Sequence, residues 1–525
     1  MLTDLEKSDN EVDCKGDVCV VGGGAVGLVI AAQLSRMGKR VILLEGGGVG
    51  LEERSQALHR VVTTGHPSKL EDFGRYRVLG GTTTFWGGQV VPLGKIVFEN
   101  RPWVTDAEWP ITNDEIYPYH LKAYELIGLK KVELDDRKIW QKIGIDPDLG
   151  PDMEMLLSRW TPRRNFARHF KKEVEGSNNL QTFIHANVTE FLLDGSGHRI
   201  VGVVARSFNG KRITVSADSV VLACGTIEIT RLLLQPSGGA SPYPWQANSW
   251  IGRGFIDHVD SLAGTVKILD QNIFHKMFDS IVIDKFRYFP RIHLRSETQK
   301  NENALDIAAH FKFDSITFQH LVNIKMFIWS IIDGKVPADI WKFPIHILAV
   351  MKIALPIALR YFIDHRLYKP AGGTVYLQLT SEQIPNPASS IRLVDEKDEL
   401  GMRRVEVDWK FDGREIKTFA IFSRLIRDAL RDRGIAEITL DPDLESESPA
   451  YFDRVFDGNH HMSTTRIGKT ADEGVVDSDL RVHGTENLYV AGAAVFPTSG
   501  FANSTLTAIA LGLRLCDHLD RNSDR

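Results

Sequence analysis

A glycine-rich turn near the N-terminus has the residue types and spacing that bind phosphate groups. Gly22, Gly24 and Gly27 form a Gly-x-Gly-x-x-Gly sequence directly after an apolar strand pattern, Asp17–Val21. Gly22 permits the tight turn, Gly24 lets the backbone approach a pyrophosphate, and Gly27 lets the next helix lie close to the strand. The N–H groups at the start of that helix, near Ala25, would point at the phosphates. The turn therefore predicts a dinucleotide site.

An acidic residue ends the second strand pattern. Val41–Leu44 is apolar, and Glu45 follows it. A carboxylate at this place accepts hydrogen bonds from a ribose and disfavours a 2′-phosphate, which argues against NADP. The order of strand, glycine turn, helix, strand and acid predicts dinucleotide binding, but it does not separate FAD from NAD.

Three later segments also place glycine beside apolar patterns. Arg77–Gly88 reads RVLGGTTTFWGG, a loop rich in N–H groups and hydroxyls that, taken alone, is equally typical of an ordinary turn. Ser219–Leu234 reads as a strand, Gly225 and a helix. Asn487–Gly492 is a strand pattern that leads into a helix over Thr505–Leu519. Together these units predict one nucleotide-binding sheet assembled from distant parts of the chain.

Composition argues against several other classes of protein. The chain has 525 residues, of which 43% are hydrophobic, so it can bury a large core in two or more structural units. Lys and Arg number 63 and Asp and Glu 68, a net charge of −5 without long single-sign blocks. This balance argues against a nucleic-acid partner and against disorder.

Cysteine usage and the N-terminal sequence indicate a reducing compartment. Cys14, Cys19, Cys224 and Cys516 lack the spacing of a zinc site, and they are too few for a disulfide framework. The N-terminal sequence MLTDLEKSDNEVDCKGD has no apolar core of a secretory signal. We therefore expect a cytoplasmic protein without a metal site.

One apolar stretch qualifies this expectation. Phe343–Ile363 is strongly apolar and follows a second apolar run, Val322–Ile332, but Lys352, Arg360 and two prolines interrupt the later run. Neither run gives a clean segment of about 20 apolar residues, so a membrane span is not expected. The first interpretation is a buried helical layer or a cover of a substrate domain. The second is peripheral contact of 343–363 with a membrane surface, or contact with an apolar substrate.

Blocks along much of the chain resemble the glucose–methanol–choline (GMC) oxidoreductases. Both ends and several internal blocks match in the right order, although residues 265–370 show little that can be placed. The blocks that carry the resemblance are VVGGGAVG with Glu45, LGGTTTFWGG, VVLACGTIEITRLLL, GRGFIDH at Gly252–His258, EQIPNPASSIRL at Glu382–Leu393, HHMSTTRIG at His460–Gly468, and Gly474–Gly512.

The resemblance implies an α/β fold, α+β overall, with two domains. A Rossmann-like FAD-binding domain would be assembled from the discontinuous segments 1–98, 180–258 and 458–525. A substrate domain, 99–179 and 259–457, would carry an antiparallel sheet that covers the flavin and shapes the substrate pocket. Strand patterns in TVYLQLT, SIRLV and RRVEVDWKF, and the amphipathic pattern IKTFAIFSRLIRDALRDRG, agree with this division.

The resemblance also implies which residues hold the cofactor, FAD. They belong to the first glycine turn, the LGGTTTFWGG loop, the middle segment, and the C-terminal strand and helix. These residues are Gly22, Gly24, Ala25, Gly27, Glu45, Gly81, Thr82, Trp86, Gly87, Gly88, Val188, Gly492, Ala493, Asn503, Ser504 and Thr505.

Two side chains carry the chemistry that the resemblance implies, which is hydride transfer from an alcohol carbon to flavin N5. His460 matches the first position of the family's H-x-x-G-T motif, and a histidine suits the removal of a hydroxyl proton because its reference pKa, about 6.5, is near working pH. Asn503 can hydrogen-bond the substrate oxygen, or it can cap the following helix. His461 is then a neighbour. Without the resemblance, the histidine pair is typical of a structural pair in a loop.

Departures from the family pattern refine these expectations. Ser463 replaces the usual glycine of the motif, and Ser504 replaces a frequent proline. Phe85 stands where some sugar-oxidising relatives carry the histidine that binds FAD covalently, so we expect noncovalent FAD. The sequence contains no second dinucleotide fingerprint, so we expect electrons to leave to oxygen, a quinone or a redox protein.

Three functions stay open. The first is an FAD-dependent dehydrogenase or oxidase acting on CH–OH groups, with a sugar, glycoside or polyol-like alcohol as substrate. The second is a lyase of the same fold, in which FAD is structural and no net redox occurs. The third is a non-enzymatic, flavin-bearing partner subunit, which the presence of both His460 and Asn503 disfavours.

Overall fold

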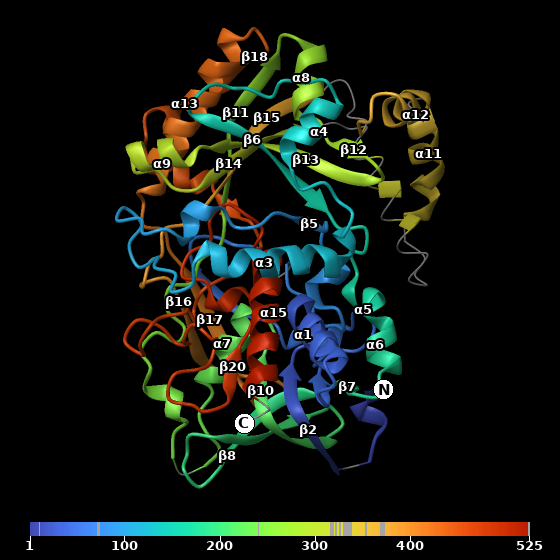
Figure 1. The fold of residues 1–525 in the computed structure, drawn as a ribbon, viewed down its shortest axis with the longest axis vertical. Helices are drawn as coiled ribbons and strands as arrows, with labels where there is room; N and C mark the ends of the chain where they lie inside the picture. The colour runs from blue at the N-terminus through green and yellow to red at the C-terminus, as the bar shows by residue number, and fades with distance from the viewer. Residues whose placement is uncertain are drawn as a thin grey trace.

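The computed structural model in Figure 1 describes most of the chain. The described residues are 1–9, 11–70, 74–239, 241–314, 320, 323–324, 327–328, 339–351, 354–367 and 373–522. Most of the apolar run Val322–Ile332 lies outside the described residues, as does Lys352.

A mostly parallel sheet forms the lower half of the molecule in Figure 1. β2 (Glu11–Val21), α1 (Ala25–Arg36) and β3 (Val41–Leu44) are the predicted strand, helix and strand. β2 begins earlier than its apolar pattern because it pairs with β10 (Arg212–Leu222) over its whole length. From edge to edge the sheet contains β1 (Leu2–Asp4), β7 (Leu180–Ile184), β3, β2, β10, β9 (Ile200–Arg206) and β8 (Asn187–Leu193), with β20 (Leu488–Val490) beside β10.

The strands of this sheet come from the beginning, the middle and the end of the chain. Only the pairings of β9 with β10 and with β8 are antiparallel. The predicted fold class, with a Rossmann-like sheet assembled from discontinuous segments, is confirmed. The C-terminal helix α15 (Ser504–Asn522) contacts α1 and α3 (Asn113–Tyr124) on one side of the sheet.

An antiparallel sheet forms the upper half of the molecule (Figure 1). Its order is β18 (Ala436–Leu440), β11 (Val259–Ile268), β15 (Thr374–Ser381), β14 (Ile307–Asp314), β13 (Phe286–Leu294), β6 (Met153–Trp160) and β5 (Gln89–Val90), with β12 (Ile281–Ile283) on β13 and β19 (Phe456–Asp457) on β11. The amphipathic helix α13 (Glu415–Asp432) packs against β18, β14 and β15.

A third sheet joins distant parts of the chain. It contains β16 (Ser390–Lys397), β17 (Arg403–Trp409) and β4 (Val62–Gly65), so a strand near the N-terminus pairs with one that we placed in the substrate domain. The domain limits themselves stay a prediction. The other helices are α2 (Glu53–Ala57), α4 (Asp136–Lys142), α5 (Phe166–His169), α6 (Lys171–Gly176), α7 (Thr226–Leu234), α8 (Gln271–Phe278), α9 (Ser296–Glu302) and α14 (Pro442–Glu445).

Two short helices stand at the side of the upper half (Figure 1). They are α11 (Phe343–Met351) and α12 (Ala354–Phe362). Leu348 is 61% exposed, Met351 64% and Phe362 76%, so these side chains are not part of a buried layer, whereas a cover of the substrate domain stays a prediction. Among the described residues, no helix is long and apolar enough to cross a membrane.

Candidate active site

A large cavity opens at the carboxyl ends of the parallel strands. β2, β3, β10 and β20 run in the same direction and end at its wall. This edge of an open α/β sheet is where ligands bind. The cavity measures about 540 Å³, and its wall also includes parts of the loop 74–87, the segment 458–461 and the start of α15. We call it the cofactor cavity.

The glycine turn between β2 and α1 has the geometry that its sequence predicts. Gly22 has a φ of 104°, and a Cβ on Gly27 would lie 1.9 Å from the carbonyl oxygen of Gly22. A side chain at Gly27 would therefore push α1 away from the strand. A Cβ on Gly24 would meet nothing within 4 Å, so this side of the turn is open. The unpaired N–H groups of the first turn of α1 fit a pyrophosphate here.

Glu45 has a second role that we did not predict. Its Oε2 accepts the N–H of Gly23 and its Oε1 the N–H of Gly47, each at 2.7 Å. The buried carboxylate thus fastens the end of β3 to the glycine turn. Glu45 also lines the cofactor cavity, and its hydrogen bond to a ribose stays a prediction.

The structure brings most of the predicted cofactor residues together. Three of the predicted residues do not line the cofactor cavity. Gly27 lies inside α1, Gly88 packs against Arg164, and Asn503 lines a different cavity. The others line the cofactor cavity: Gly22, Gly24, Ala25, Glu45, Gly81, Thr82, Trp86, Gly87, Val188, Gly492, Ala493, Ser504 and Thr505. Their contacts with FAD stay a prediction.

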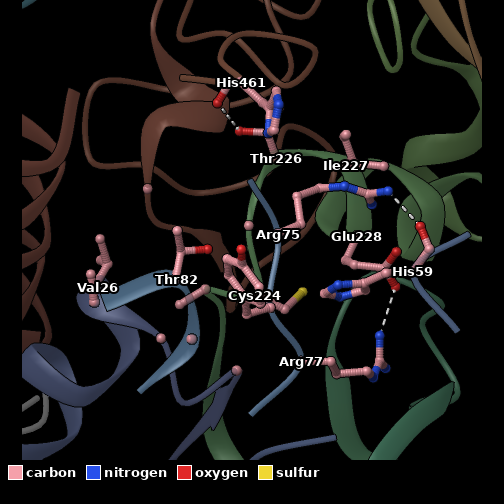
Figure 2. A pocket seen from close by; sticks show the side chains of 18 of the residues that line it. Val26, His59, Arg75, Arg77, Thr82, Cys224, Thr226, Ile227, Glu228 and His461 are labelled. Carbon is pink, nitrogen blue, oxygen red and sulfur yellow. Dashed lines mark hydrogen bonds and ion pairs between the residues drawn. The ribbon is translucent and has the colours of Figure 1, made fainter. Parts of the chain in front are cut away.

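A charged group in the same cavity was not predicted from the sequence. Figure 2 shows Arg75 and Arg77 on either side of Glu228 and His59, with Arg77 Nη1 3.2 Å from the Glu228 carboxylate. Although burial acts to raise it, the neighbouring Arg231, His59 and Arg77 lower the pKa of Glu228 to about 2. Arg75 Nε and Nη1 have no hydrogen-bond partner among the described residues, so they are donors available to a polar ligand such as FAD. In the sequence, the two arginines just before the LGGTTTFWGG loop were the signal from which this charged group could have been predicted.

A second cavity, of about 370 Å³, lies on one face of the antiparallel sheet, and we call it the sheet cavity. Arg287, Phe289 and Arg291 occupy alternate positions of β13, so their side chains point to the same face. The lining residues are Gln89, Trp160, Asp260, Arg287, Phe289, Arg291, His310, Gln378, Thr380, His460, Phe501 and Asn503. Among the described residues, only His460 lines both cavities.

His460 stands between Asn503 and His258. Asn503 Nδ2 lies 3.1 Å from His460 Nε2, and His460 Nδ1 lies 2.9 Å from His258 Nδ1. Because an amide nitrogen only donates, His460 Nε2 accepts, and the ring proton is on Nδ1, which donates to His258. Burial, together with the charge of Arg291, lowers the pKa of His460 to about 4. The ring is therefore neutral at pH 7 with Nε2 unprotonated, and its pKa lies well below the near-neutral value that we expected for the base.

Asp257 holds these histidines in place, a role that we did not predict. Its Oδ1 accepts the N–H of His258 at 2.6 Å and the N–H of His460 at 2.8 Å. Burial raises the pKa of the Asp257 carboxyl well above its usual value. Both Asp257 and His258 belong to the GRGFIDH block, so the Asp-His pair just before β11 was the signal available in the sequence.

His461 has different surroundings from its neighbour. It lines the cofactor cavity but not the sheet cavity, and its ring stacks on Phe255 at a centroid distance of 6.1 Å. Its carbonyl oxygen accepts the hydroxyl of Thr226 at 2.7 Å, as Figure 2 shows. Burial lowers the pKa of His461 to about 3. His461 is therefore held by the protein on the cofactor side.

Comparison with known families and proteins agrees with this architecture. Models of the GMC oxidoreductases match residues 159–260 and 385–512, and a model of NAD(P)-binding Rossmann-like domains matches residues 20–88. The chain is 23% identical to 6'''-hydroxyparomomycin C oxidase of Streptomyces lividus over 547 residues, which is 95% of this chain and 90% of the relative.

Two further relatives match over shorter spans. The fructose dehydrogenase large subunit of Gluconobacter japonicus is 31% identical over 156 residues, 30% of this chain and 27% of that subunit. (R)-mandelonitrile lyase 1 of Prunus serotina is 25% identical over 276 residues, 45% of this chain and 46% of the lyase. A crystal structure of formate oxidase superposes with a TM-score of 0.60 and 17% identity, over 98% of this chain and 99% of that one, a likeness of fold.

Proposed function

The chain belongs to the GMC oxidoreductases, an FAD-dependent family, and from this premise we propose that it oxidises a CH–OH group of a sugar, glycoside or polyol-like alcohol. Membership of the family supports an FAD-dependent oxidoreductase, because the relatives include an oxidase and a dehydrogenase. We further propose that His460 is the base and that Asn503 orients the alcohol.

The position of His460 carries this proposal. Its ring lines both cavities, and Nε2 accepts a hydrogen bond from an amide that lines the sheet cavity. An alcohol in the sheet cavity would displace the hydrogen bond between Asn503 and His460, so that its hydroxyl donates to Nε2 of the neutral base and its oxygen accepts from the amide. His461 is the weaker candidate because it does not line the sheet cavity.

The proposed reaction removes one proton and one hydride from the alcohol, which leaves a carbonyl group. His460 Nε2 accepts the hydroxyl proton, while the Asn503 amide donates a hydrogen bond to the alcohol oxygen. FAD held in the cofactor cavity supplies the hydride acceptor. His460 then carries protons on both nitrogens, and its Nδ1–H stays bonded to His258, which keeps the ring in position.

Anaerobic flavin bleaching tests the proposal. Purified yellow protein is mixed with a panel of sugars, glycosides and polyols without oxygen, and absorbance of the oxidised flavin is followed. We expect at least one alcohol to bleach the flavin and to yield its carbonyl product. Failure of every alcohol in the panel, together with normal chemical reduction by dithionite, would contradict the function.

We propose that FAD is bound noncovalently. Phe85 lines the cofactor cavity and stacks on Tyr76 at 4.0 Å, and its ring has no atom that forms a flavin linkage. Acid precipitation should release FAD into the supernatant, whereas colour in the washed pellet would contradict the proposal. The electron acceptor is oxygen, a quinone or a redox protein. Reoxidation of the bleached enzyme by each class in turn identifies it.

A non-redox lyase is the second candidate. The chain resembles a mandelonitrile lyase over 45% of its length, and a lyase also uses a base beside a hydroxyl group. The same bleaching experiment separates the two functions. Turnover of mandelonitrile without any bleaching, and without oxidation of any alcohol, would favour the lyase.

We propose peripheral membrane contact through 343–363. Leu348 and Phe362 are strongly exposed on α11 and α12, as the apolar side chains of interfacial helices are. Lys342 and Arg360 add basic residues to the same segment, and they form ion pairs with Asp339 and Asp279. The protein should sediment with anionic liposomes, and Leu348→Glu with Phe362→Glu should release it. The matched control is Leu269→Glu, an exposed leucine elsewhere. Equal sedimentation of both variants would contradict the contact.

A further inference from the structure

Two arginines of the sheet cavity lack a carboxylate partner. Arg291 is 8% exposed, its Nε and Nη1 have no hydrogen-bond partner among the described residues, and Nη2 reaches only Gln89 Oε1 at 3.5 Å. Arg287 lies 3.9 Å over the ring of Trp160 and donates to the hydroxyl of Ser280, while its Nε is unpartnered. Arg291 is a buried charge, which is normally paired, and Arg287 is half-buried in the same cavity, so a ligand of negative charge fits these guanidinium groups.

Several arginines buried elsewhere in the described chain bind carboxylates, although Arg75 and Arg366 donate to backbone carbonyl oxygens instead. Examples are the ion pairs Arg101–Glu382 at 2.6 Å, Arg159–Asp136 at 2.5 Å and Arg231–Asp398 at 2.5 Å. Each of these pairs satisfies its charge inside the protein, and Arg101–Glu382 is bidentate. The sheet cavity therefore differs from these three sites and is like the surroundings of Arg75 in the cofactor cavity, because its cations face an open space.

The acid of the cavity compensates these cations only in part, through the attraction between Asp260 and Arg291. Asp260 is the carboxylate of the lining, and its Oδ2 accepts the amide of Gln378 at 3.2 Å. In the described structure the side-chain hydrogen bonds of Arg287 and Arg291 go to Ser280 and Gln89 rather than to Asp260. Burial raises the pKa of Asp260 to about 6 and lowers that of Arg287 to about 10. At pH 7 two cations thus outnumber one anion.

We propose that the alcohol oxidised at this site carries an acidic group, a carboxylate or a phosphate, which Arg291 and Arg287 bind. The proposal rests on the function proposed above. His460 and Asn503 line the same cavity as the arginines, so one molecule can place its hydroxyl at the base and its oxyanion at the guanidinium groups. A cavity of about 370 Å³ suits a compact polar molecule such as a sugar acid.

Matched substrates test the acidic group. D-gluconate is compared with D-glucitol, D-glucuronate with D-glucose, and D-glucose 6-phosphate with D-glucose, each by anaerobic flavin bleaching. We expect kcat/KM for at least one acid to exceed that for its neutral partner about tenfold or more, because a hydrogen-bonded charge pair contributes that much. The first two pairs test a carboxylate, and the third tests a phosphate.

Arginine variants assign the effect to the cavity. Arg291→Gln should lower kcat/KM for the preferred acid about 10- to 100-fold and for its neutral partner less than threefold, and Arg291→Lys should keep part of the preference. Arg392→Gln, an exposed arginine outside the cavity, is the control and should change neither. Inorganic phosphate should perturb the flavin spectrum of the wild type but not that of Arg291→Gln.

The outcomes separate this inference from the proposed function. Bleaching by neutral alcohols at least as fast as by the acids, or equal losses on both in Arg291→Gln, would overturn the acidic group and leave alcohol oxidation standing. Bleaching by none of these substrates, with phosphate binding that depends on Arg291, would support the anion site and count against the oxidation. No bleaching and no anion binding would overturn both.

Discussion

The cofactor cavity and the sheet cavity meet at His460, but they are built differently. Much of the wall of the cofactor cavity is backbone at the ends of parallel strands, as at Gly22, Gly24 and Gly492. The wall of the sheet cavity is made of side chains on one face of an antiparallel sheet, such as Arg291 on β13 and Gln378 on β15. A cavity wall made of backbone requires glycine at fixed positions of the sequence. A cavity wall made of side chains is visible in the sequence only as residues at alternate positions of several separate strands.

This difference predicts that the cofactor cavity binds FAD and that the sheet cavity binds the alcohol, and variants of each cavity test this prediction. A substitution of His460, which lines both cavities, should slow the reaction and leave FAD binding intact. A change at the glycine turn should weaken FAD binding and leave the base intact. The following variants are ordered by the size of the effect that we expect.

His460→Ala should have the largest effect. Loss of a general base costs about 10²- to 10⁴-fold in rate, about 3–5 kcal/mol of barrier. FAD should stay bound, because most of the cofactor wall is unchanged. Anaerobic stopped-flow bleaching with a good substrate measures the rate, and flavin content measures binding.

His461→Ala is the matched control for this variant. It removes the adjacent ring, which lines only the cofactor cavity, and should slow bleaching far less. Collapse of bleaching in His461→Ala with near-normal bleaching in His460→Ala would reverse the assignment of the two histidines. Normal bleaching in both would remove the proposed base.

Asn503→Ala should slow bleaching about 10- to 100-fold. The amide donates to His460 Nε2 at 3.1 Å and would position the alcohol oxygen, and a misplaced hydroxyl loses its reactive geometry. FAD affinity should change little, because Asn503 lines the sheet cavity rather than the cofactor cavity. If Asn503→Ala instead bound FAD more weakly but bleached at the normal rate, Asn503 would act in FAD binding rather than in positioning the alcohol.

Glu45→Ala tests the cofactor side and should weaken FAD binding about tenfold or more, because a hydrogen bond to a carboxylate contributes about 1.5–3 kcal/mol. Titration of apoprotein with FAD, followed by flavin fluorescence, measures the affinity. Glu399→Ala, at an exposed ion pair with Arg54, is the control. Unchanged affinity in Glu45→Ala would show that the carboxylate serves only Gly23 and Gly47.

The same contrast explains how much the sequence predicts. The glycine turn with its flanking strand, helix and strand is readable because local backbone geometry dictates it. The assembly of the sheet from distant segments was predicted from the repeated strand, glycine and helix patterns and from the family resemblance, but the strand order was not. Arg287 and Arg291 were missed because a cavity on a sheet face depends on which strands pair, and β13 lies between β14 and β6, which are far from each other in sequence. The remaining signal was the presence of Arg287, Phe289 and Arg291 at alternate positions of FRYFPR, which places them on one face of a strand.

Ser463→Gly should stabilise the protein slightly. Ser463 has a φ of 65°, in the left-handed region that favours glycine, at the position where the family motif has glycine. Relief of this conformation should raise the free energy of unfolding by about 0.5–1 kcal/mol. The thermal midpoint of the holoenzyme at fixed FAD concentration measures the change. Ser423→Gly, within helix α13, should shift it the opposite way, and a lowered midpoint in Ser463→Gly would contradict the strain.

The pH dependence of bleaching should show the smallest change. Burial and the charge of Arg291 lower the pKa of His460 to about 4, so Nε2 stays unprotonated and basic from pH 7 down to about pH 5. The rate should fall only as pH drops through the pKa, because a proton on Nε2 blocks acceptance of the hydroxyl proton. Between pH 7 and 5.5 we expect less than a twofold loss, whereas an unshifted histidine with a pKa of about 6.5 would lose about eightfold.

Asp260→Asn makes this measurement decisive. Burial raises the pKa of Asp260 to about 6, so its protonation would change the charge of the sheet cavity in the same pH range as an unshifted histidine. A fall in rate near pH 6 that disappears in Asp260→Asn would belong to the sheet cavity and leave the base assignment intact. A fall centred near pH 6.5 that persists in Asp260→Asn would show that the base keeps an ordinary pKa. The burial of His460 at the junction of the two cavities would then not control its protonation.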